Sequence, residues 1–134
     1  MRNHLSFKAS ITATKLIPGN NGSYADFPDD LNRDLKEALI KRGIERLYSH
    51  QAEAWRLIKE GKNVCIQTPT SSGKTLCYNM PVVNSIIEDS ESRALYIFPT
   101  KALSQDQIFE LNDIINKLGI DVYAQTFDGD TPQN

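Results

Sequence analysis

The sequence predicts an α/β domain built on an open, doubly wound parallel sheet. Three predicted strands, at residues 63–68, 94–98 and 121–127, alternate with segments in which apolar residues recur at helical spacing. The first two are continuous apolar runs, which are typical of parallel strands buried on both faces. Two helices precede the first strand and one helix follows each of the first two strands, so the order favours crossover connections between parallel strands.

The length and composition of the chain limit its class. A chain of 134 residues with 40% hydrophobic and 24% charged residues suits one globular domain. The net charge of −2 excludes a generally basic surface, so contact with nucleic acid would need a local groove. Cys65 and Cys77 lack a second Cys/His cluster and are expected to be small buried apolar residues in a reducing compartment. No apolar run approaches membrane length, so we expect a cytoplasmic protein without membrane contact.

The first 28 residues are expected to form an irregular arm, with a loop at 18–22 and one short strand near residues 10–14. A first helix is predicted from Asp29 to a stop at Gly43, and a second from an N-cap at Ser49 to a stop at Gly61. Residues 29–134 are then the folded domain. Trp55 lies on an apolar helical face and is expected in the core, and Phe27, which precedes the first helix, is expected to pack against the helices.

A turn of glycine and small hydroxyl residues, Thr68–Thr75, separates the first predicted strand from the next helix. Small residues let backbone N–H groups surround an anion, and the helix N-terminus adds partial positive charge. Lys74 would then reach the β- and γ-phosphates, and the Thr75 hydroxyl would ligate Mg²⁺. The pattern G-x-x-x-x-G-K-[ST] is met only in its second half, because Thr68 replaces the first glycine. Taken alone, the turn also fits a solvated loop.

The ends of the three predicted strands lead into residues 68–75, 99–102 and 128–131. In an open parallel sheet, ligands bind beyond the carboxyl ends of the strands. The three loops are therefore expected on one edge, where a nucleotide and a second polyanion could be bound together. The intervening helix after residue 75 carries Pro81, which is expected to kink it.

Several stretches in the correct order resemble the first motor domain of superfamily 2 helicases. Gly43–Gln51 resembles the Q-motif region, Thr68–Thr75 resembles motif I, and Phe98–Leu103 together with Asp106 and Gln107 resembles motif Ia. Residues 75–81 and 127–132 are similar to the branch that contains bacterial DNA-repair helicases and large helicase-related proteins. The resemblance covers about residues 27–132 and implies a RecA-like fold.

The resemblance implies ATP and Mg²⁺ as ligands, with Thr75 on the metal and nucleotide contacts at Gln51, Thr70, Ser71, Ser72, Gly73, Lys74 and Thr75. The Gln51 amide would pair with N6 and N7 of adenine and so favour ATP over GTP; an exposed residue at a helix start is the alternative. Single-stranded DNA or RNA, with DNA favoured, would contact Pro99, Thr100, Lys101 and Ala102. A solvated helix N-terminus is the alternative for these four.

The acidic pair with which this superfamily hydrolyses ATP is not found in the chain, because Asp128 and Asp130 belong to the turn that resembles a different motif. We therefore expect residues 29–134 to be an incomplete ATP-binding domain, the N-terminal piece of a DNA helicase, without hydrolysis on its own. The strands that flank the phosphate-loop strand in this superfamily come later. The three strands present should pair in another order, pair with the missing remainder or another chain, or leave the domain marginal. A short non-catalytic module that pairs with another protein is the alternative function, and a small kinase is a weaker one.

Overall fold

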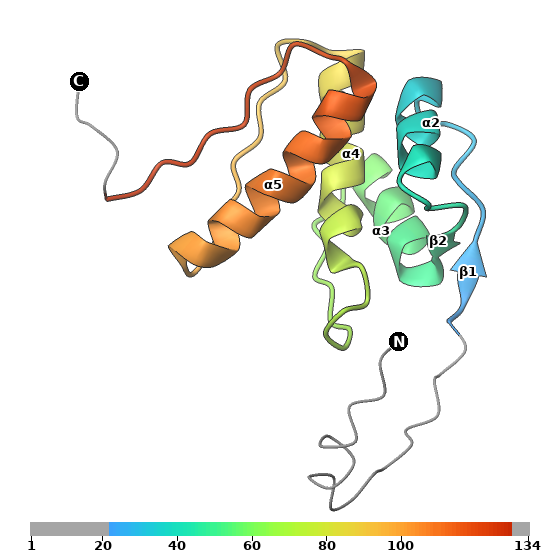
Figure 1. Ribbon diagram of the computed structural model, residues 1–134. Helices are drawn as coiled ribbons and strands as arrows, with labels where there is room; N and C mark the ends of the chain where they lie inside the picture. Colours follow the sequence, from blue (N-terminus) through green and yellow to red (C-terminus); the bar gives the residue numbers. More distant parts are fainter. Residues whose placement is uncertain (1–21, 130–134) are drawn as a thin grey trace, which may run out of the picture.

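The computed structural model describes residues 22–129. Its elements are β1 (Tyr24–Ala25), α2 (Arg33–Lys41), β2 (Leu47–Tyr48), α3 (Ser49–Lys59), α4 (Lys74–Glu88) and α5 (Lys101–Leu118) (Figure 1). The predicted short strand near residues 10–14 and the end of the 127–132 turn lie outside the described residues. None of the described helices is both long and apolar enough to cross a membrane.

The helices α2, α3 and α4 and the second half of α5 pack around one core (Figure 1). Its fully buried members, each at most 1% exposed, include Leu35, Leu39, Leu47, Met80 and Ile114. Burial of each such side chain contributes about 1.5–3 kcal/mol. Phe27 and Trp55 are 9% and 3% exposed, which confirms their prediction as core residues.

The helix ends follow local capping chemistry. The first helix begins at Arg33, later than the predicted start at Asp29, because the Asn32 side chain caps it by accepting from the N–H of Asp34 at 2.9 Å and of Leu35 at 3.2 Å. The predicted stop at Gly43 is confirmed, with a left-handed φ of 84°. Helix α4 continues through Pro81 to Glu88.

The only sheet among the described residues is the antiparallel pair of β1 and β2, with Tyr24 opposite Tyr48 and Ala25 opposite Leu47. The N–H of Ser49 also donates to the carbonyl of Ser23 at 2.8 Å. This short pair, which has no counterpart among the predicted strands, ties the chain before α2 to the start of α3.

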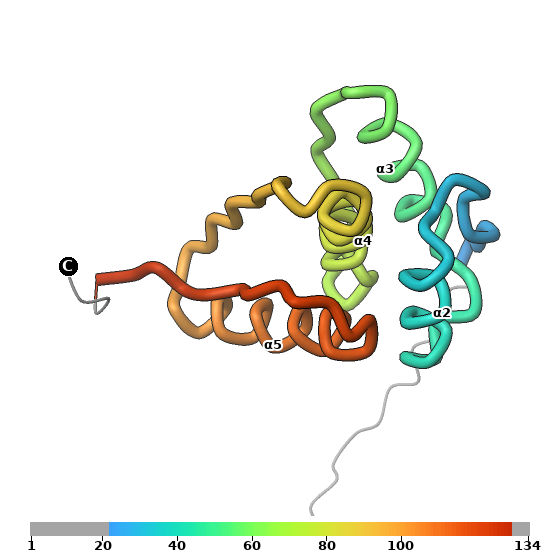
Figure 2. Tube along the Cα trace, turned by 90° about the horizontal axis from the view of Figure 1, so that it is seen from above, coloured from blue at the N-terminus to red at the C-terminus, as the bar shows by residue number. Residues whose placement is uncertain are grey.

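The three predicted strands are extended segments that form no strand pairing among residues 22–129. Leu95, Ile97 and Phe127 are 87%, 85% and 92% exposed. Figure 2 shows residues 120–129 running back along α5, while residues 92–98 leave α4 on a separate course. A strand needs a neighbour about 4.8 Å away to close its hydrogen bonds, and the described part of the chain supplies none. The three-stranded sheet therefore stays a prediction.

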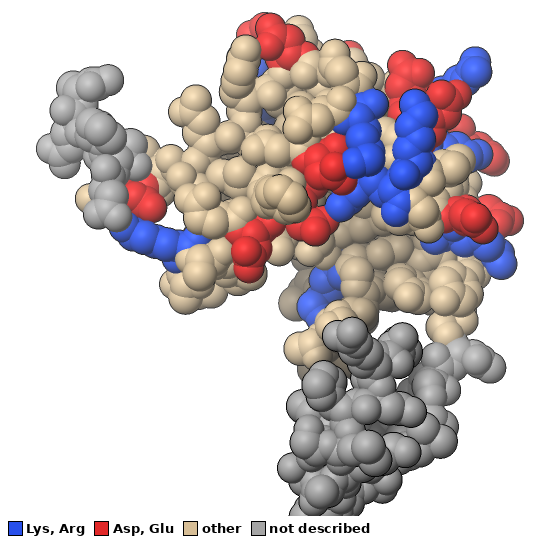
Figure 3. Space-filling view, viewed as in Figure 1, with Lys and Arg blue, Asp and Glu red and all other residues tan. Residues whose placement is uncertain are grey.

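The two cysteines differ in burial in the same way as the helices and the extended segments that carry them. Cys77 on α4 is buried, as predicted, whereas the prediction that Cys65 is buried is wrong, because the extended segment that carries it is uncovered. A groove of about 870 Å³ lies between two of the extended segments, 94–98 and 121–127, and the helices α4 and α5. Charged side chains gather over the α2 side of the molecule in Figure 3, and the face beside this groove is largely uncharged.

Candidate nucleotide site

The turn at residues 68–75 enters α4 through Gly73, whose backbone is left-handed with φ 73° and ψ 28°. Ser71 is the one described residue other than glycine with positive φ, at 60°. A Cβ atom on Gly73 would lie 2.6 Å from Nε2 of Gln51, closer than real Cβ contacts come. Both the φ value and the close approach therefore favour glycine at position 73.

The Lys74 side chain folds back into the turn. Its Nζ donates to the carbonyl oxygens of Thr68 at 2.9 Å and Pro69 at 2.6 Å, and lies 3.5 Å from Oγ of Ser72. The hydroxyl oxygens of Thr68 and Ser72 are 2.6 Å apart, and this hydrogen bond joins the two ends of the turn around Lys74. The turn thus holds the Lys74 ammonium at its centre. The same turn contains the small residues predicted to surround a phosphate, which are Thr70, Ser71, Ser72 and Gly73.

Gln51 links the start of α3 to this turn. Its Oε1 accepts from the N–H of Tyr48 at 2.8 Å, and its Nε2 donates to the carbonyl of Gly73 at 2.8 Å. Gln51 is 4% exposed, so the alternative of an exposed helix-start residue is wrong. A primary amide has two N–H donors and two lone pairs, so one of each remains after these bonds. That remaining pair matches the adenine contact that the sequence predicts for Gln51.

A pocket of about 680 Å³ adjoins the turn, and its lining includes Gly43, Arg46, Gln51, Gly73, Thr75 and Asn79. Asn79 is 1% exposed, and neither its Oδ1 nor its Nδ2 has a partner among the described residues. A buried unpaired amide costs on the order of 1–3 kcal/mol, so a polar partner is expected at this point. Asn79 was not among the predicted site residues; the signal was a polar residue on an otherwise apolar helix face.

The predicted nucleic-acid loop, Pro99–Ala102, forms the exposed N-terminus of α5. The Thr100 hydroxyl caps the helix by accepting from the N–H of Leu103 at 3.2 Å. Nζ of Lys101 lies 3.7 Å from Oδ1 of Asp128, which brings the loops after the second and third predicted strands together. The N-termini of α4 and α5 both lie toward the lower part of Figure 1. Contact of this loop with nucleic acid stays a prediction.

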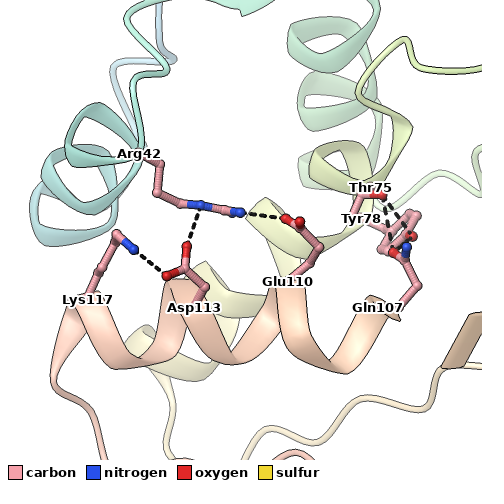
Figure 4. A network of polar contacts seen from close by, with 7 residues as sticks. All are labelled: Arg42, Thr75, Tyr78, Gln107, Glu110, Asp113 and Lys117. Atoms are coloured by element: carbon pink, nitrogen blue, oxygen red, sulfur yellow. Dashed lines mark hydrogen bonds and ion pairs between the residues drawn. The ribbon is translucent and has the colours of Figure 1, made fainter. Parts of the chain in front are cut away.

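Gln107 joins the predicted phosphate turn, residues 68–75, to α5. Its Oε1 accepts from the hydroxyl of Tyr78 at 2.6 Å and from the hydroxyl of Thr75 at 3.2 Å (Figure 4). All three side chains are half-buried. Farther along α5, Arg42 donates to Glu110 at 2.5 Å and lies 2.8 Å from Asp113, which fixes the helix against the end of α2 (Figure 4). Only a tertiary contact reveals this role of Gln107.

The described residues hold no group of three or more His, Cys, Asp or Glu side chains able to bind a metal ion by themselves. The Thr75 hydroxyl lies at the start of α4 beside Lys74, where a metal held mainly by nucleotide phosphates would need one protein oxygen. Gly73, Lys74 and Thr75 together therefore fit a magnesium–nucleotide complex.

Comparison with known proteins identifies relatives over most of the chain. The model of the DEAD/DEAH box helicase family matches residues 48–134. The chain is 54% identical over 104 residues to the uncharacterized ATP-dependent helicase YprA of Bacillus subtilis, a match that covers 78% of this chain and 14% of that protein. It is 41% identical over 123 residues to the ATP-dependent helicase hrq1 of Schizosaccharomyces pombe, covering 90% of this chain and 12% of that protein.

Among solved structures, the chain is similar to the helicase MrfA bound to DNA and AMPPNP. The TM-score is 0.83 at 49% identity, and the match covers 87% of this chain and 16% of that one. The same helicase bound to DNA alone matches with a TM-score of 0.82. The chain thus spans a small part of each relative's length.

Proposed function

Because the chain belongs to the DEAD/DEAH box helicase family and has its RecA-like fold, we propose that it forms the ATP- and nucleic-acid-binding part of an ATP-dependent DNA helicase. The observation that carries the proposal is the turn at residues 68–75, which holds the Lys74 ammonium at its centre and enters α4 through Gly73.

Residues 70–75 would hold the phosphates. Backbone N–H groups at the start of α4 would face the anion, and Lys74 would exchange the carbonyls of Thr68 and Pro69 for phosphate oxygens. The Thr75 hydroxyl would contribute one ligand to Mg²⁺. When bound, Mg²⁺ neutralises charge on the phosphate oxygens.

The adenine would enter the pocket beside Gln51. The remaining donor and acceptor of the Gln51 amide support this placement, because adenine presents an acceptor and a donor side by side at N7 and N6. The unpaired amide of Asn79, in the lining of the same pocket, supports a polar ligand there.

Single-stranded DNA would contact Pro99, Thr100, Lys101 and Ala102. The exposed N-terminus of α5 offers N–H groups, one hydroxyl and one ammonium to a phosphate backbone. DNA is favoured over RNA because MrfA was crystallised with DNA. With one cation in this loop, binding by it should be modest and should weaken with salt.

The extended segments 63–68, 94–98 and 121–127 would be strands of the parallel sheet of the family. Their exposed apolar side chains support this, because each would be covered once neighbouring strands join from the remainder of the helicase or from another chain. Residues 1–134 alone would then bind ATP without hydrolysing it. The alternative, a non-catalytic module that pairs with another protein, would use the same exposed segments.

The test is a titration of ATP with Mg²⁺ against the wild type and Lys74→Ala. Loss of the ammonium should weaken binding by about tenfold or more, because it removes charge-assisted hydrogen bonds to phosphate. Lys62→Ala is the matched control, since Lys62 lies outside the turn and pairs with Glu60. Equal affinities of Lys74→Ala and wild type would contradict the proposal.

A companion measurement compares ATP with GTP in wild type and Gln51→Ala. The wild type should prefer ATP and the variant should lose that preference, whatever its overall affinity; equal affinities in the wild type would refute the adenine role. Residues 1–134 should show no ATP turnover above Lys74→Ala. Turnover that disappears in that variant would overturn the assignment of a binding part alone.

A further inference from the structure

The amide oxygen of Gln107 accepts two hydroxyl protons at the edge of the phosphate turn. One comes from Thr75 at 3.2 Å and the other from Tyr78 at 2.6 Å (Figure 4). We infer that Gln107 is a positioning residue that orients the Thr75 hydroxyl toward a nucleotide-bound metal and links that hydroxyl to α5. The inference rests on the proposed function, because it requires the turn to bind a magnesium–nucleotide complex.

The direction of the Thr75 proton is the physical reason. A hydroxyl has one proton and two lone pairs, and it can ligate Mg²⁺ only through a lone pair. Its proton must therefore point away from the metal, toward an acceptor. Oε1 of Gln107 is that acceptor, and its two lone pairs are matched by the two hydroxyls that approach it. Partial burial of all three side chains reduces competition from water.

The second half of the inference concerns where Gln107 is held. It lies on α5, the helix whose first turn carries Thr100 and Lys101. The same helix is fixed against the end of α2 by the pairs of Arg42 with Glu110 and Asp113. Single-stranded nucleic acid bound at the start of α5 would thus affect the position of Gln107, which accepts the Thr75 proton, through one rigid helix.

Tyr78 adds a second connection to the same place. Its ring meets Tyr96 edge-on, with centroids 5.7 Å apart and planes at 67°, and Tyr96 stacks on Phe98 at 6.1 Å. Phe98 directly precedes the Pro99–Ala102 loop. Of the two hydroxyls that donate to the Gln107 oxygen, that of Thr75 belongs to the phosphate turn. That of Tyr78 is connected through Tyr96 and Phe98 to the nucleic-acid loop.

The experiment measures the dissociation constant of AMPPNP for the 134-residue chain, once with Mg²⁺ and once with EDTA. In Gln107→Leu, which keeps the size and removes the acceptor, the tightening by Mg²⁺ should fall by about tenfold or more, as for other residues that orient metal ligands. The constant in EDTA should stay unchanged. Gln107→Glu keeps an acceptor and should retain most of the Mg²⁺ effect. Gln105→Leu, an exposed neighbour on the same helix, is the matched control.

The outcomes separate the two levels of the proposal. If the wild type binds AMPPNP without any Mg²⁺ effect, or if Thr75→Val keeps that effect, the proposed metal site itself fails. If Thr75→Val loses the effect and Gln107→Leu keeps it, the positioning role alone is overturned. A Gln107→Leu variant that weakens binding equally in Mg²⁺ and EDTA also overturns it, because that result indicates a general structural role.

The link to nucleic acid is read in the same titration with a single-stranded oligonucleotide present. In wild type the oligonucleotide should change the Mg²⁺-dependent affinity for AMPPNP, and in Gln107→Leu that change should be lost while Gln107→Glu retains it. An unchanged response to the oligonucleotide in Gln107→Leu would contradict the link through α5.

Discussion

Leucines lie at opposite extremes of exposure in two regions of the molecule. Leu35 and Leu39 on α2 are 0% exposed, whereas Leu95, in an equally apolar run, is 87% exposed. A helix closes its backbone hydrogen bonds within its own segment and needs only one face covered. A strand needs a neighbouring strand to close its backbone hydrogen bonds, and the described residues provide none for residues 94–98. Local sequence therefore suffices for the helical half and not for the sheet.

The largest effect that distinguishes the two regions is expected in amide hydrogen exchange. In the 134-residue chain, the amides of residues 94–98 should exchange near the rate of an unstructured peptide. Those of Leu39 and Met80 should exchange on the order of a thousandfold more slowly, because they open only with the core. Equal protection of both sets of amides would show that the extended segments do pair with a neighbouring strand.

The next largest effect is expected from a matched pair of core and surface substitutions. Leu35→Ala should lower the free energy of unfolding by about 2–5 kcal/mol, since it leaves a cavity in the core. Leu95→Ala should change it by no more than about 0.5 kcal/mol in the same chain. Urea unfolding followed by circular dichroism gives both values, and a large loss in Leu95→Ala would mean that residues 94–98 are covered.

A smaller effect is expected where the helical half meets the phosphate turn. Gly73→Ala and Gly43→Ala should each cost about 1–2 kcal/mol, because both backbones have positive φ. Of these two positions, only position 73 has side chains within 4 Å of the added Cβ, those of Gln51 and Tyr48. Gly73→Ala should therefore cost more than Gly43→Ala in thermal unfolding and should alone weaken ATP binding. Equal unfolding temperatures and equal ATP affinities of the two variants would show that the close contact at position 73 has no energetic effect.

The smallest effect leaves stability unchanged and concerns the two cysteines. Burial raises the pKa of the Cys77 thiol despite the nearby Lys74 ammonium, so at pH 8 less of it is the reactive thiolate. Cys65 lies exposed in an extended segment. Mass spectrometry after brief alkylation should find one label, on Cys65, in the folded chain and two labels in urea. Rapid labelling of Cys77 in the folded chain would contradict the closed core around α4.

The features that could be predicted from the sequence are those with local causes. The stop at Gly43, the core positions of Phe27 and Trp55 and the turn at residues 68–75 follow from spacing, backbone preference and residue size. The exposure of Cys65 could not be predicted in this way, because a continuous apolar run indicates burial only once a partner covers it.

The same division holds within the candidate site. Lys74, Thr75 and Gln51 were found from motif spacing, and the structure gathers them around one turn. Asn79 was not assigned a site role and Gln107 was named only within the motif Ia resemblance, because the contacts of both come from tertiary neighbours. Asn79 is identified by an amide without partners in the described part of the chain, and Gln107 by two hydroxyls that reach it from α4.

The position of the Lys74 ammonium has a kinetic consequence. Its Nζ already contacts carbonyl oxygens of its own turn, so an anion that enters competes with the main chain for the same cation. Entry is then a replacement of oxygen neighbours, and the turn has no bare charge to stabilise between ligands. In the proposed binding cycle, the carbonyls of Thr68 and Pro69 would take the place of a departing phosphate, and α4 would keep its first turn intact for the next ligand.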